Sequence, residues 1–287
     1  MDSRLSTFVS DKSSQVSDTM VTSVASSIRP PIEKIMFPAP RPGYNQFHPK
    51  LKFVGPANSR VALMSYIVNT RRPTILYGHG NASDIGYMND FLESLSRDLC
   101  CNIVSYDYEG YGLTVSRDPF NKPTERGCIR ATETVYNYLV DDLKVLPSDI
   151  ILYGTSIGTG PIVKLGATLA EQGIVVRGIL LQTPYSSIFG VVSESIESSC
   201  YYTGRVIEDP NMFKSGEEIG KIKSRIAIIH GPNDEVIPYA NAERLHLAAK
   251  NSKLVTIPTA THNNIEGVPE HYEILKQTIR DLINHVE

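Results

Sequence analysis

Short apolar runs alternate with longer amphipathic stretches from residue 51 to the end of the chain. The runs rich in β-branched and large apolar residues predict eight strands, at 51–54, 61–68, 74–77, 102–106, 150–153, 175–181, 225–229 and 254–257. Apolar residues at helical spacing predict five helices, at 83–99, 128–143, 162–170, 240–249 and 271–286. Because strands alternate with helices, we expect an α/β fold with a mostly parallel central sheet and helices on both faces.

The first 50 residues lack this alternation. Residues 1–28 are rich in serine and carry few large apolar groups, a composition typical of disordered segments. Residues 29–49 contain prolines at 30, 31, 38, 40 and 42, which predict an extended lead-in along a domain surface. We therefore expect a disordered segment over residues 1–30 and a single domain over residues 31–287.

A possible nucleophile lies where one predicted strand runs into a predicted helix. Residues 151–160 read Ile-Leu-Tyr-Gly-Thr-Ser-Ile-Gly-Thr-Gly and contain the pattern G-x-S-x-G. This pattern is typical of a nucleophile elbow, a sharp turn that exposes one serine hydroxyl, here that of Ser156. Gly154 and Gly158 would leave the space that such a strained turn needs. The motif alone is common, but an apolar strand before it and a helical stretch after it are the required context.

A serine hydroxyl becomes a good nucleophile only beside a base, and a third group must orient that base. In enzymes with this elbow the chain order is serine, acid, histidine. Asp234 follows the predicted strand 225–229, and His262 follows the strand 254–257. Since neighbouring parallel strands bring such loops together, we predict Ser156, Asp234 and His262 as a catalytic triad. Glu235 is an alternative acid, and we expect His230 to be a structural residue.

The loop after strand 74–77 is a candidate oxyanion hole. It reads Gly-His-Gly-Asn-Ala-Ser-Asp over residues 78–84. An oxyanion needs two donors aimed at the developing charge, and we expect the backbone N–H groups of Asn81 and Ile157 to supply them. The alternative for His79-Gly80 is a tight turn without a catalytic role. The glycine pair also resembles phosphate-binding loops, but neither G-x-G-x-x-G nor a P-loop lysine follows, so we expect no nucleotide.

Composition narrows the class of protein further. The 287 residues are 41% hydrophobic and 21% charged, with a net charge of −3 and no basic stripe, so we expect no nucleic-acid partner. The four cysteines, Cys100, Cys101, Cys128 and Cys200, lack metal-ligand spacing and indicate a reducing compartment. No apolar run is long enough to span a bilayer, and no signal-peptide core is visible. We expect a cytoplasmic protein without a metal or organic cofactor.

Together these motifs resemble the α/β-hydrolase superfamily from about residue 31 to the end. Within it, the chain is most similar to the alpha/beta-hydrolase-domain proteins numbered 17, which are protein depalmitoylases. The matching segments are residues 79–84, 105–112, 153–159, 229–237 and 262–263. The resemblance implies the α/β-hydrolase fold, with Ser156 as nucleophile, Asp234 as acid and His262 as base. It also implies that the segment containing Tyr111 shapes the floor of the site and that Asp107 is a structural turn residue.

The resemblance predicts an acyl-protein thioesterase, acting on an acylated protein or a small acyl ester. The alternatives are a carboxylesterase or lysophospholipase, and a non-catalytic binding module on the same fold. A short lid is expected over residues 185–224, with Ile188, Phe189 and Val192, together with Tyr111, as substrate-binding residues. The membrane-anchoring cysteine cluster of the mammalian subgroup has no counterpart before Cys100, so we expect peripheral membrane association at most.

Overall fold

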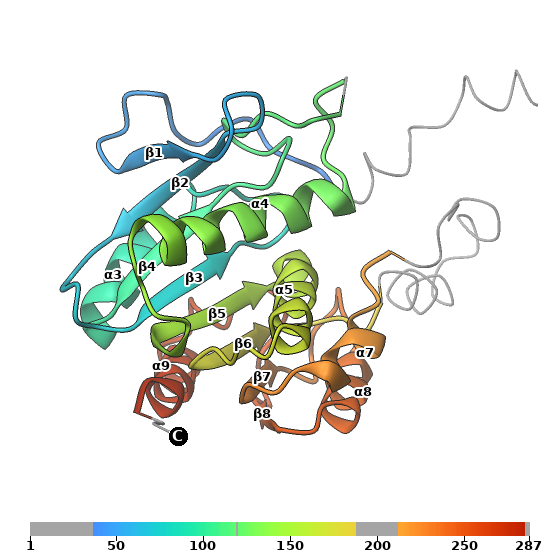
Figure 1. Ribbon diagram of the computed structural model, residues 1–287. Helices are drawn as coiled ribbons and strands as arrows, with labels where there is room; N and C mark the ends of the chain where they lie inside the picture. Colours follow the sequence, from blue (N-terminus) through green and yellow to red (C-terminus); the bar gives the residue numbers. More distant parts are fainter. Residues whose placement is uncertain (1–36, 119, 188–211, 285–287) are drawn as a thin grey trace, which may run out of the picture.

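The central sheet has eight strands in the order β1-β2-β4-β3-β5-β6-β7-β8 in the computed structural model, which describes residues 37–118, 120–187 and 212–284 (Figure 1). Strand β2 is antiparallel to both of its neighbours, β1 and β4. All pairs from β4 to β8 are parallel. The predicted α/β fold class, with its mostly parallel sheet, is confirmed.

The strands span Leu51–Val54 (β1), Val61–Tyr66 (β2), Thr74–Gly78 (β3), Asn102–Tyr106 (β4), Ile150–Thr155 (β5), Gly178–Gln182 (β6), Ile226–His230 (β7) and Ser252–Thr256 (β8). The α-helices span Asn89–Leu99 (α3), Glu125–Asn137 (α4), Thr159–Glu171 (α5), Ser215–Glu218 (α7), Ala240–Ala248 (α8) and Pro269–Asn284 (α9). Short helical turns of other types lie at Tyr138–Asp142 (η1), Pro147–Asp149 (η2), Ser156–Gly158 (η3) and Ile219–Lys221 (η4). No helix within the described ranges is long and apolar enough to cross a membrane.

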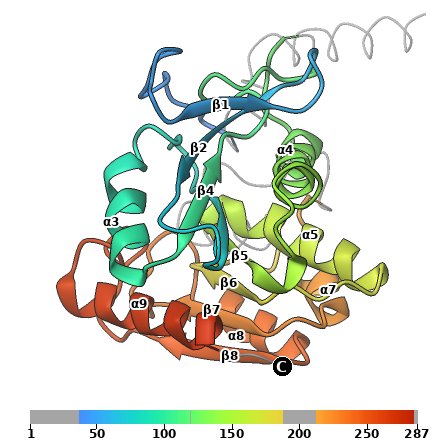
Figure 2. The same cartoon turned by 60° about the vertical axis from the view of Figure 1, so that its left-hand side comes forward.

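Helices cover both faces of the sheet (Figure 2). Helices α3 and α9 pack on one face, and α4, α5 and α8 pack on the other. The central strands are buried on both sides, so successive residues of one strand enter different cores. In β3, Ile75 and Tyr77 join the core under α3 and α9, whereas Leu76 joins the core under α4 and α5.

Several predicted helix and strand boundaries are wrong because side-chain oxygens accept backbone N–H groups near the ends of these elements. Helix α3 begins at Asn89, not at residue 83, and Asp84 Oδ1 accepts the N–H groups of Gly86 and Tyr87 in the preceding turn. Strand β2 ends at Tyr66 because the amides of Val68 and Asn69 donate to Asn102 Oδ1. The expected disordered segment over residues 1–30 lies outside the described residues, as does most of the expected lid.

Candidate active site

The chain turns sharply at Ser156, between β5 and the helical segment formed by η3 and α5. Ser156 has φ of 51°, in the left-handed region that residues other than glycine rarely adopt. The turn is so tight that a Cβ atom on Gly158 would lie 2.4 Å from the carbonyl oxygen of Gly78. A Cβ atom on Gly154 would lie 2.6 Å from the carbonyl oxygen of Gly158. Both glycines of the G-x-S-x-G pattern are therefore required by close backbone packing.

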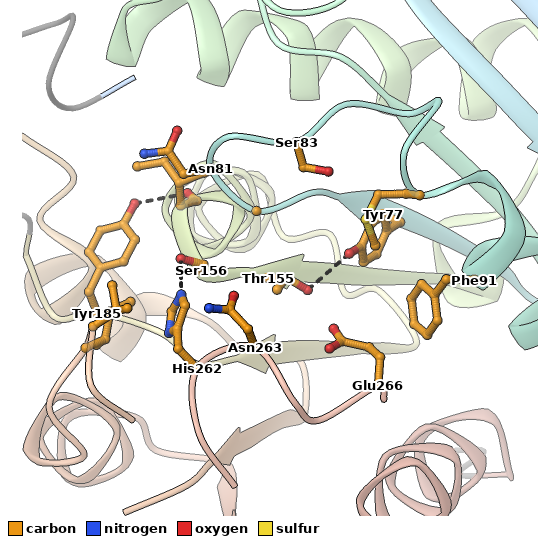
Figure 3. Close-up of a pocket in the computed structure, with 15 residues that line it drawn as sticks. Tyr77, Asn81, Ser83, Phe91, Thr155, Ser156, Tyr185, His262, Asn263 and Glu266 are labelled. Carbon is orange, nitrogen blue, oxygen red and sulfur yellow. Dashed lines mark hydrogen bonds between the residues drawn. The ribbon is translucent and has the colours of Figure 1, made fainter. Parts of the chain in front are cut away.

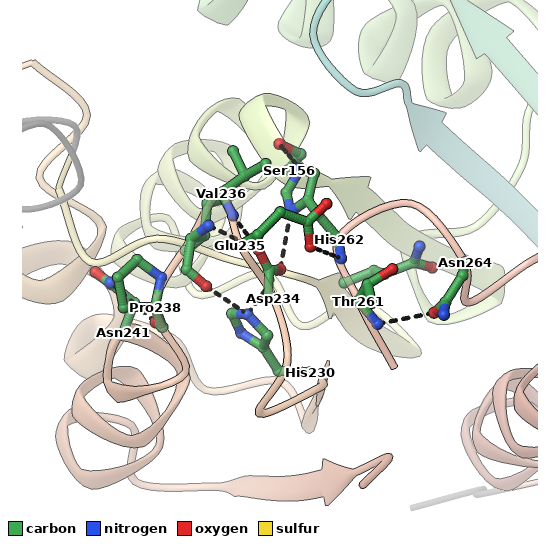
Figure 4. A network of polar contacts seen from close by, with 12 residues as sticks. Ser156, His230, Asp234, Glu235, Val236, Pro238, Asn241, Thr261, His262 and Asn264 are labelled. Atoms are coloured by element: carbon green, nitrogen blue, oxygen red, sulfur yellow. Dashed lines mark hydrogen bonds and ion pairs between the residues drawn. The ribbon is translucent and has the colours of Figure 1, made fainter. Parts of the chain in front are cut away.

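Ser156, His262 and Asp234 come together at the carboxyl ends of the parallel strands (Figure 4). His262 Nδ1 lies 2.8 Å from Asp234 Oδ2, and His262 Nε2 lies 3.1 Å from Ser156 Oγ. Because an ionised carboxylate only accepts hydrogen bonds, Nδ1 carries the hydrogen and donates it to Asp234. Nε2 is then left to accept the hydrogen bond of the serine hydroxyl. This arrangement can remove the serine proton.

The Asp234 carboxylate is stabilised in its ionised form. Its Oδ1 accepts the backbone N–H groups of Val236, at 2.9 Å, and Ile237, at 2.7 Å. Burial of the carboxyl acts to raise its pKa, but the hydrogen bonds from His230, His262 and Ile237 outweigh burial and hold the pKa well below its usual value. The carboxylate is therefore charged at neutral pH and can stabilise an imidazolium on His262.

Glu235, the alternative acid, has a different position. Its Oε2 accepts the backbone N–H of His262 at 3.3 Å, so its contact is with the loop and not with the imidazole. The carboxylate in contact with the ring belongs to Asp234. Of the two neighbouring acids, only Asp234 has the geometry to orient the base.

His230, at the end of β7, contacts the carboxylate of Asp234, a contact that the sequence did not lead us to expect. Its Nε2 lies 3.0 Å from Asp234 Oδ2 and 3.0 Å from the carbonyl oxygen of Ile237. Since both partners are acceptors, Nε2 carries a hydrogen. Its buried Nδ1 has no hydrogen-bond partner among the described residues. The spacing of four residues between His230 and Asp234 across a turn was the signal that could have revealed this contact.

The candidate oxyanion loop, residues 79–81, runs close to the nucleophile. A Cβ atom on Gly80 would lie 3.8 Å from the Cβ atom of Ser156. Two buried tyrosines hold this loop through hydrogen bonds. The Tyr108 hydroxyl donates to the carbonyl oxygen of His79 at 2.7 Å, and the Tyr111 hydroxyl donates to Asn81 Oδ1 at 2.6 Å. Tyr111 is fully buried and is not part of the lining of the cavity beside Ser156, and its hydroxyl contacts the loop; its expected role in substrate binding stays a prediction.

Asp107 contacts the first residue of this loop, His79, and also Ile85 in the segment that follows the loop. Its Oδ1 accepts the backbone N–H of Ile85 at 3.0 Å and lies 3.3 Å from His79 Nε2. Its Oδ2 accepts a hydrogen bond from the Tyr44 hydroxyl. All of these contacts are with structural elements and none with the cavity, which agrees with the structural role expected for this residue.

A cavity of about 500 Å³ opens over Ser156 (Figure 3). Its lining comprises Tyr77, Gly80, Asn81, Ser83, Met88, Phe91, Thr155, Ser156, Ile157, Tyr185, Val236, Ile237, His262, Asn263 and Glu266. Asn81 and Ile157, the residues expected to supply the oxyanion hole, thus share one cavity with Ser156 and His262. The expected substrate-binding residues Ile188, Phe189 and Val192 lie outside the described residues.

Comparison with known sequences identifies several relatives, although no family model matches the chain. The chain is 33% identical over 215 residues to an alpha/beta hydrolase of Acanthamoeba polyphaga mimivirus, covering 74% of this chain and 73% of that protein. It is 32% identical over 214 residues to human alpha/beta hydrolase domain-containing protein 17B, covering 74% of this chain and 68% of that protein. The match to protein 17C of Xenopus tropicalis, at 32% identity, spans 62% of that relative's length.

Solved structures show the same fold at low sequence identity. An alpha-beta hydrolase from Vibrio vulnificus matches with a TM-score of 0.62 and 18% identity, over 81% of this chain and 80% of that one. A thermostable carboxylesterase cloned from a metagenomic library matches with a TM-score of 0.61 and 17% identity, over 82% of this chain and 89% of that one. At these identities the likeness concerns the fold alone.

Proposed function

This chain belongs to the alpha/beta-hydrolase family, and from that premise we propose that it is a serine hydrolase that cleaves acyl esters or thioesters. The observation that carries this proposal is the contact of one imidazole, that of His262, with both Ser156 Oγ and Asp234 Oδ2. A serine that is positioned beside a base, which is itself oriented by a buried carboxylate, is the arrangement needed for nucleophilic catalysis.

In the first half of the reaction, Ser156 Oγ attacks the acyl carbonyl carbon while His262 Nε2 takes the hydroxyl proton. The resulting imidazolium is stabilised by the Asp234 carboxylate, whose low pKa keeps it charged. The tetrahedral intermediate collapses, the bond to the leaving oxygen or sulfur breaks, and His262 returns the proton to that atom. In the second half, His262 activates a water molecule in the same way, and the acid is released from Ser156.

The oxyanion of each tetrahedral intermediate would accept hydrogen bonds from the backbone N–H groups of Asn81 and Ile157. Both residues border the cavity beside Ser156, and Ile157 lies at the amino end of the helical segment that follows the elbow. A helix amino terminus favours negative charge, which supports this position for the oxyanion. The hydroxyl groups of Tyr108 and Tyr111 hold the Asn81 loop in place before the substrate arrives.

Within this reaction class we favour an acyl-protein thioesterase. The relatives numbered 17 support this choice through the depalmitoylase activity that the resemblance implies, and Ile157, Val236 and Ile237 add apolar side chains to the cavity lining that suit an acyl chain. A carboxylesterase is the second candidate, because an enzyme of that class has the same fold.

Reaction with an active-site fluorophosphonate, followed by mass spectrometry of the adduct, tests the nucleophile. We expect the adduct on Ser156 and none on the Ser156→Ala variant. Hydrolysis of an S-acyl cysteine peptide, compared with the matching O-acyl serine peptide, tests the substrate class. Labelling that persists in Ser156→Ala would exclude the nucleophile, and faster cleavage of the oxygen ester would favour the carboxylesterase.

A further inference from the structure

A carboxylate lies on the wall of the same cavity as the candidate nucleophile. Glu266, in the turn between His262 and α9, is half-buried and lines the cavity together with Ser156 and Phe91. In Figure 3 the carboxylate of Glu266 points into the cavity, toward Asn263. The carboxylate of Glu266 takes no part in the proposed catalytic steps. A charged group beside apolar side chains in this cavity therefore needs another role.

Glu266 is held in place from behind by a short chain of hydrogen bonds. Its Oε1 accepts a hydrogen bond from Gln182 Nε2 at 2.5 Å, and Gln182 Oε1 accepts one from the Tyr153 hydroxyl at 2.5 Å. Gln182 and Tyr153 are both fully buried. Since a carboxylate can only accept, the amide nitrogen of Gln182 must face Glu266, which fixes the order of the chain. The carboxylate is therefore positioned, and among the described residues nothing donates a hydrogen bond to its second oxygen.

The charge of Glu266 is not balanced by a cation of the cavity. Of the 15 cavity-lining residues, all within the described part of the chain, none is a lysine or an arginine. The group behind Glu266, the Gln182 amide, is neutral. The negative charge also affects its neighbours: burial raises the pKa of the Tyr77 hydroxyl, and the charge of Glu266 raises it further. Glu266 thus adds a negative charge to a cavity whose lining carries no lysine or arginine.

The neighbours of this carboxylate define what it can bind. Tyr77 and Phe91 border the same cavity with ring centroids 6.4 Å apart, and Met88 belongs to the same lining. Aromatic faces next to a carboxylate favour an ammonium or guanidinium group, which gains from both the charge and the ring electrons. The same carboxylate repels an anionic substrate, so it selects against carboxylates and phosphates as well as for cations.

We propose that Glu266 is a specificity residue that forms a cation subsite beside Ser156, and that the preferred substrate carries an ammonium or guanidinium group near its acyl bond. This subsite serves the acyl hydrolysis proposed above, and its catalytic meaning rests on that function. The cation could belong to a lysine or arginine side chain next to an acylated cysteine, or to the alcohol or thiol part of a small acyl ester. Both sources share the same chemistry and can be separated by experiment.

The decisive comparison uses S-octanoyl cysteine peptides that differ at one flanking position, which holds lysine, norleucine or glutamate. For the wild type we expect kcat/KM to fall in that order, with a ratio of about tenfold or more between lysine and glutamate. In Glu266→Gln, which keeps the shape and can still accept from Gln182, the ratio should fall below about threefold. Glu270→Gln, an exposed carboxylate in the first turn of α9, is the matched control and should keep the wild-type ratio.

A second pair of substrates tests the other source of the cation. Octanoylthiocholine is compared with its uncharged 3,3-dimethylbutyl thioester analogue in the same three proteins. If only this pair shows a preference that depends on Glu266, the cation belongs to a small substrate. If neither pair shows it, the cation subsite does not exist, even where all substrates are cleaved through Ser156.

Binding to an inactive variant separates the subsite from the reaction. Calorimetric titration of Ser156→Ala with the intact lysine and norleucine peptides should show tighter binding of the lysine peptide. The double variant Ser156→Ala/Glu266→Gln should bind both equally. A preference seen in binding without any hydrolysis by the wild type would refute the proposed function and leave the subsite intact. Equal binding of the two peptides to Ser156→Ala, together with equal binding of octanoylthiocholine and its uncharged analogue, would overturn the subsite.

Discussion

His230 and His262 contact the same oxygen atom of Asp234, at 3.0 and 2.8 Å. The other oxygen of that carboxylate accepts two backbone N–H groups, from Val236 and Ile237. Both oxygens of Asp234 therefore accept hydrogen bonds, and His230 shares Oδ2 with the base. His230 acts through the acid and is a positioning residue, since it contacts neither Ser156 nor the cavity.

Replacement of His230 should lower kcat and leave KM nearly unchanged. His230→Leu removes the donor to Asp234, so the carboxylate can rotate, and we expect a loss in kcat of about 10- to 100-fold, below the cost of losing the triad acid. His230→Gln retains a side-chain donor and should recover part of this loss. Steady-state kinetics together with thermal melts provide the measurement. Equal kcat in the leucine and glutamine variants would mean that His230 only fills space.

The two neighbouring carboxylates should differ strongly in their effect on catalysis. Asp234→Asn should reduce kcat by about 10⁴-fold, because the base loses the partner that sets its tautomer. Glu235→Gln, which changes a contact with the backbone of His262, should cost less than about fivefold. The comparison uses the same acyl substrate and fluorophosphonate labelling rates. A larger loss for Glu235→Gln than for Asp234→Asn would show that the acid has been assigned to the wrong residue.

The low pKa of Asp234 predicts how its contribution to stability depends on pH. A carboxyl whose pKa is lower in the folded state than in the unfolded chain stabilises the fold at any pH above its unfolded value. That value is about 4 for aspartate, and the stabilisation is lost as the pH falls below it toward the folded value. The difference in free energy of unfolding between wild type and Asp234→Asn should therefore be constant above about pH 5 and should shrink toward pH 2. Urea titrations across this range measure it, and an unchanged difference at low pH would contradict the shift.

Tyr111→Phe should impair the oxyanion hole without touching the substrate. The variant removes the hydroxyl that donates to Asn81 Oδ1 at 2.6 Å but keeps the buried ring. Loss of one positioning hydrogen bond of about 1 kcal/mol corresponds to roughly a fivefold lower kcat, far below the loss of an oxyanion donor itself. Burst kinetics with an activated ester separate acylation from later steps. If KM rises while kcat is unchanged, Tyr111 contributes to substrate binding after all.

The features of this site that can be predicted from sequence are those that depend on local chain order. Apolar runs predict the strands, and chemistry-bearing residues just after strand ends predict that Ser156, Asp234 and His262 meet, since parallel strands end at one edge of the sheet. The contact between Gln182 and Glu266 joins residues 84 positions apart and has no local signal. The side-chain direction of Tyr111 also depends on tertiary packing, so its burial and its contact with Asn81 Oδ1 have no local signal either.

The length of the acyl chain should control the rate up to the capacity of the cavity. Each methylene buried against the apolar side chains of the cavity contributes about 0.8 kcal/mol, which corresponds to roughly a fourfold rise in kcat/KM per carbon. A cavity of about 500 Å³ is of the size that holds a small-molecule ligand, so this rise should continue over medium chains and then stop when the wall is covered. A series of S-acyl peptides from acetyl to palmitoyl measures the dependence. Rates that do not change with chain length, combined with faster cleavage of short oxygen esters, would contradict the thioesterase and support the carboxylesterase.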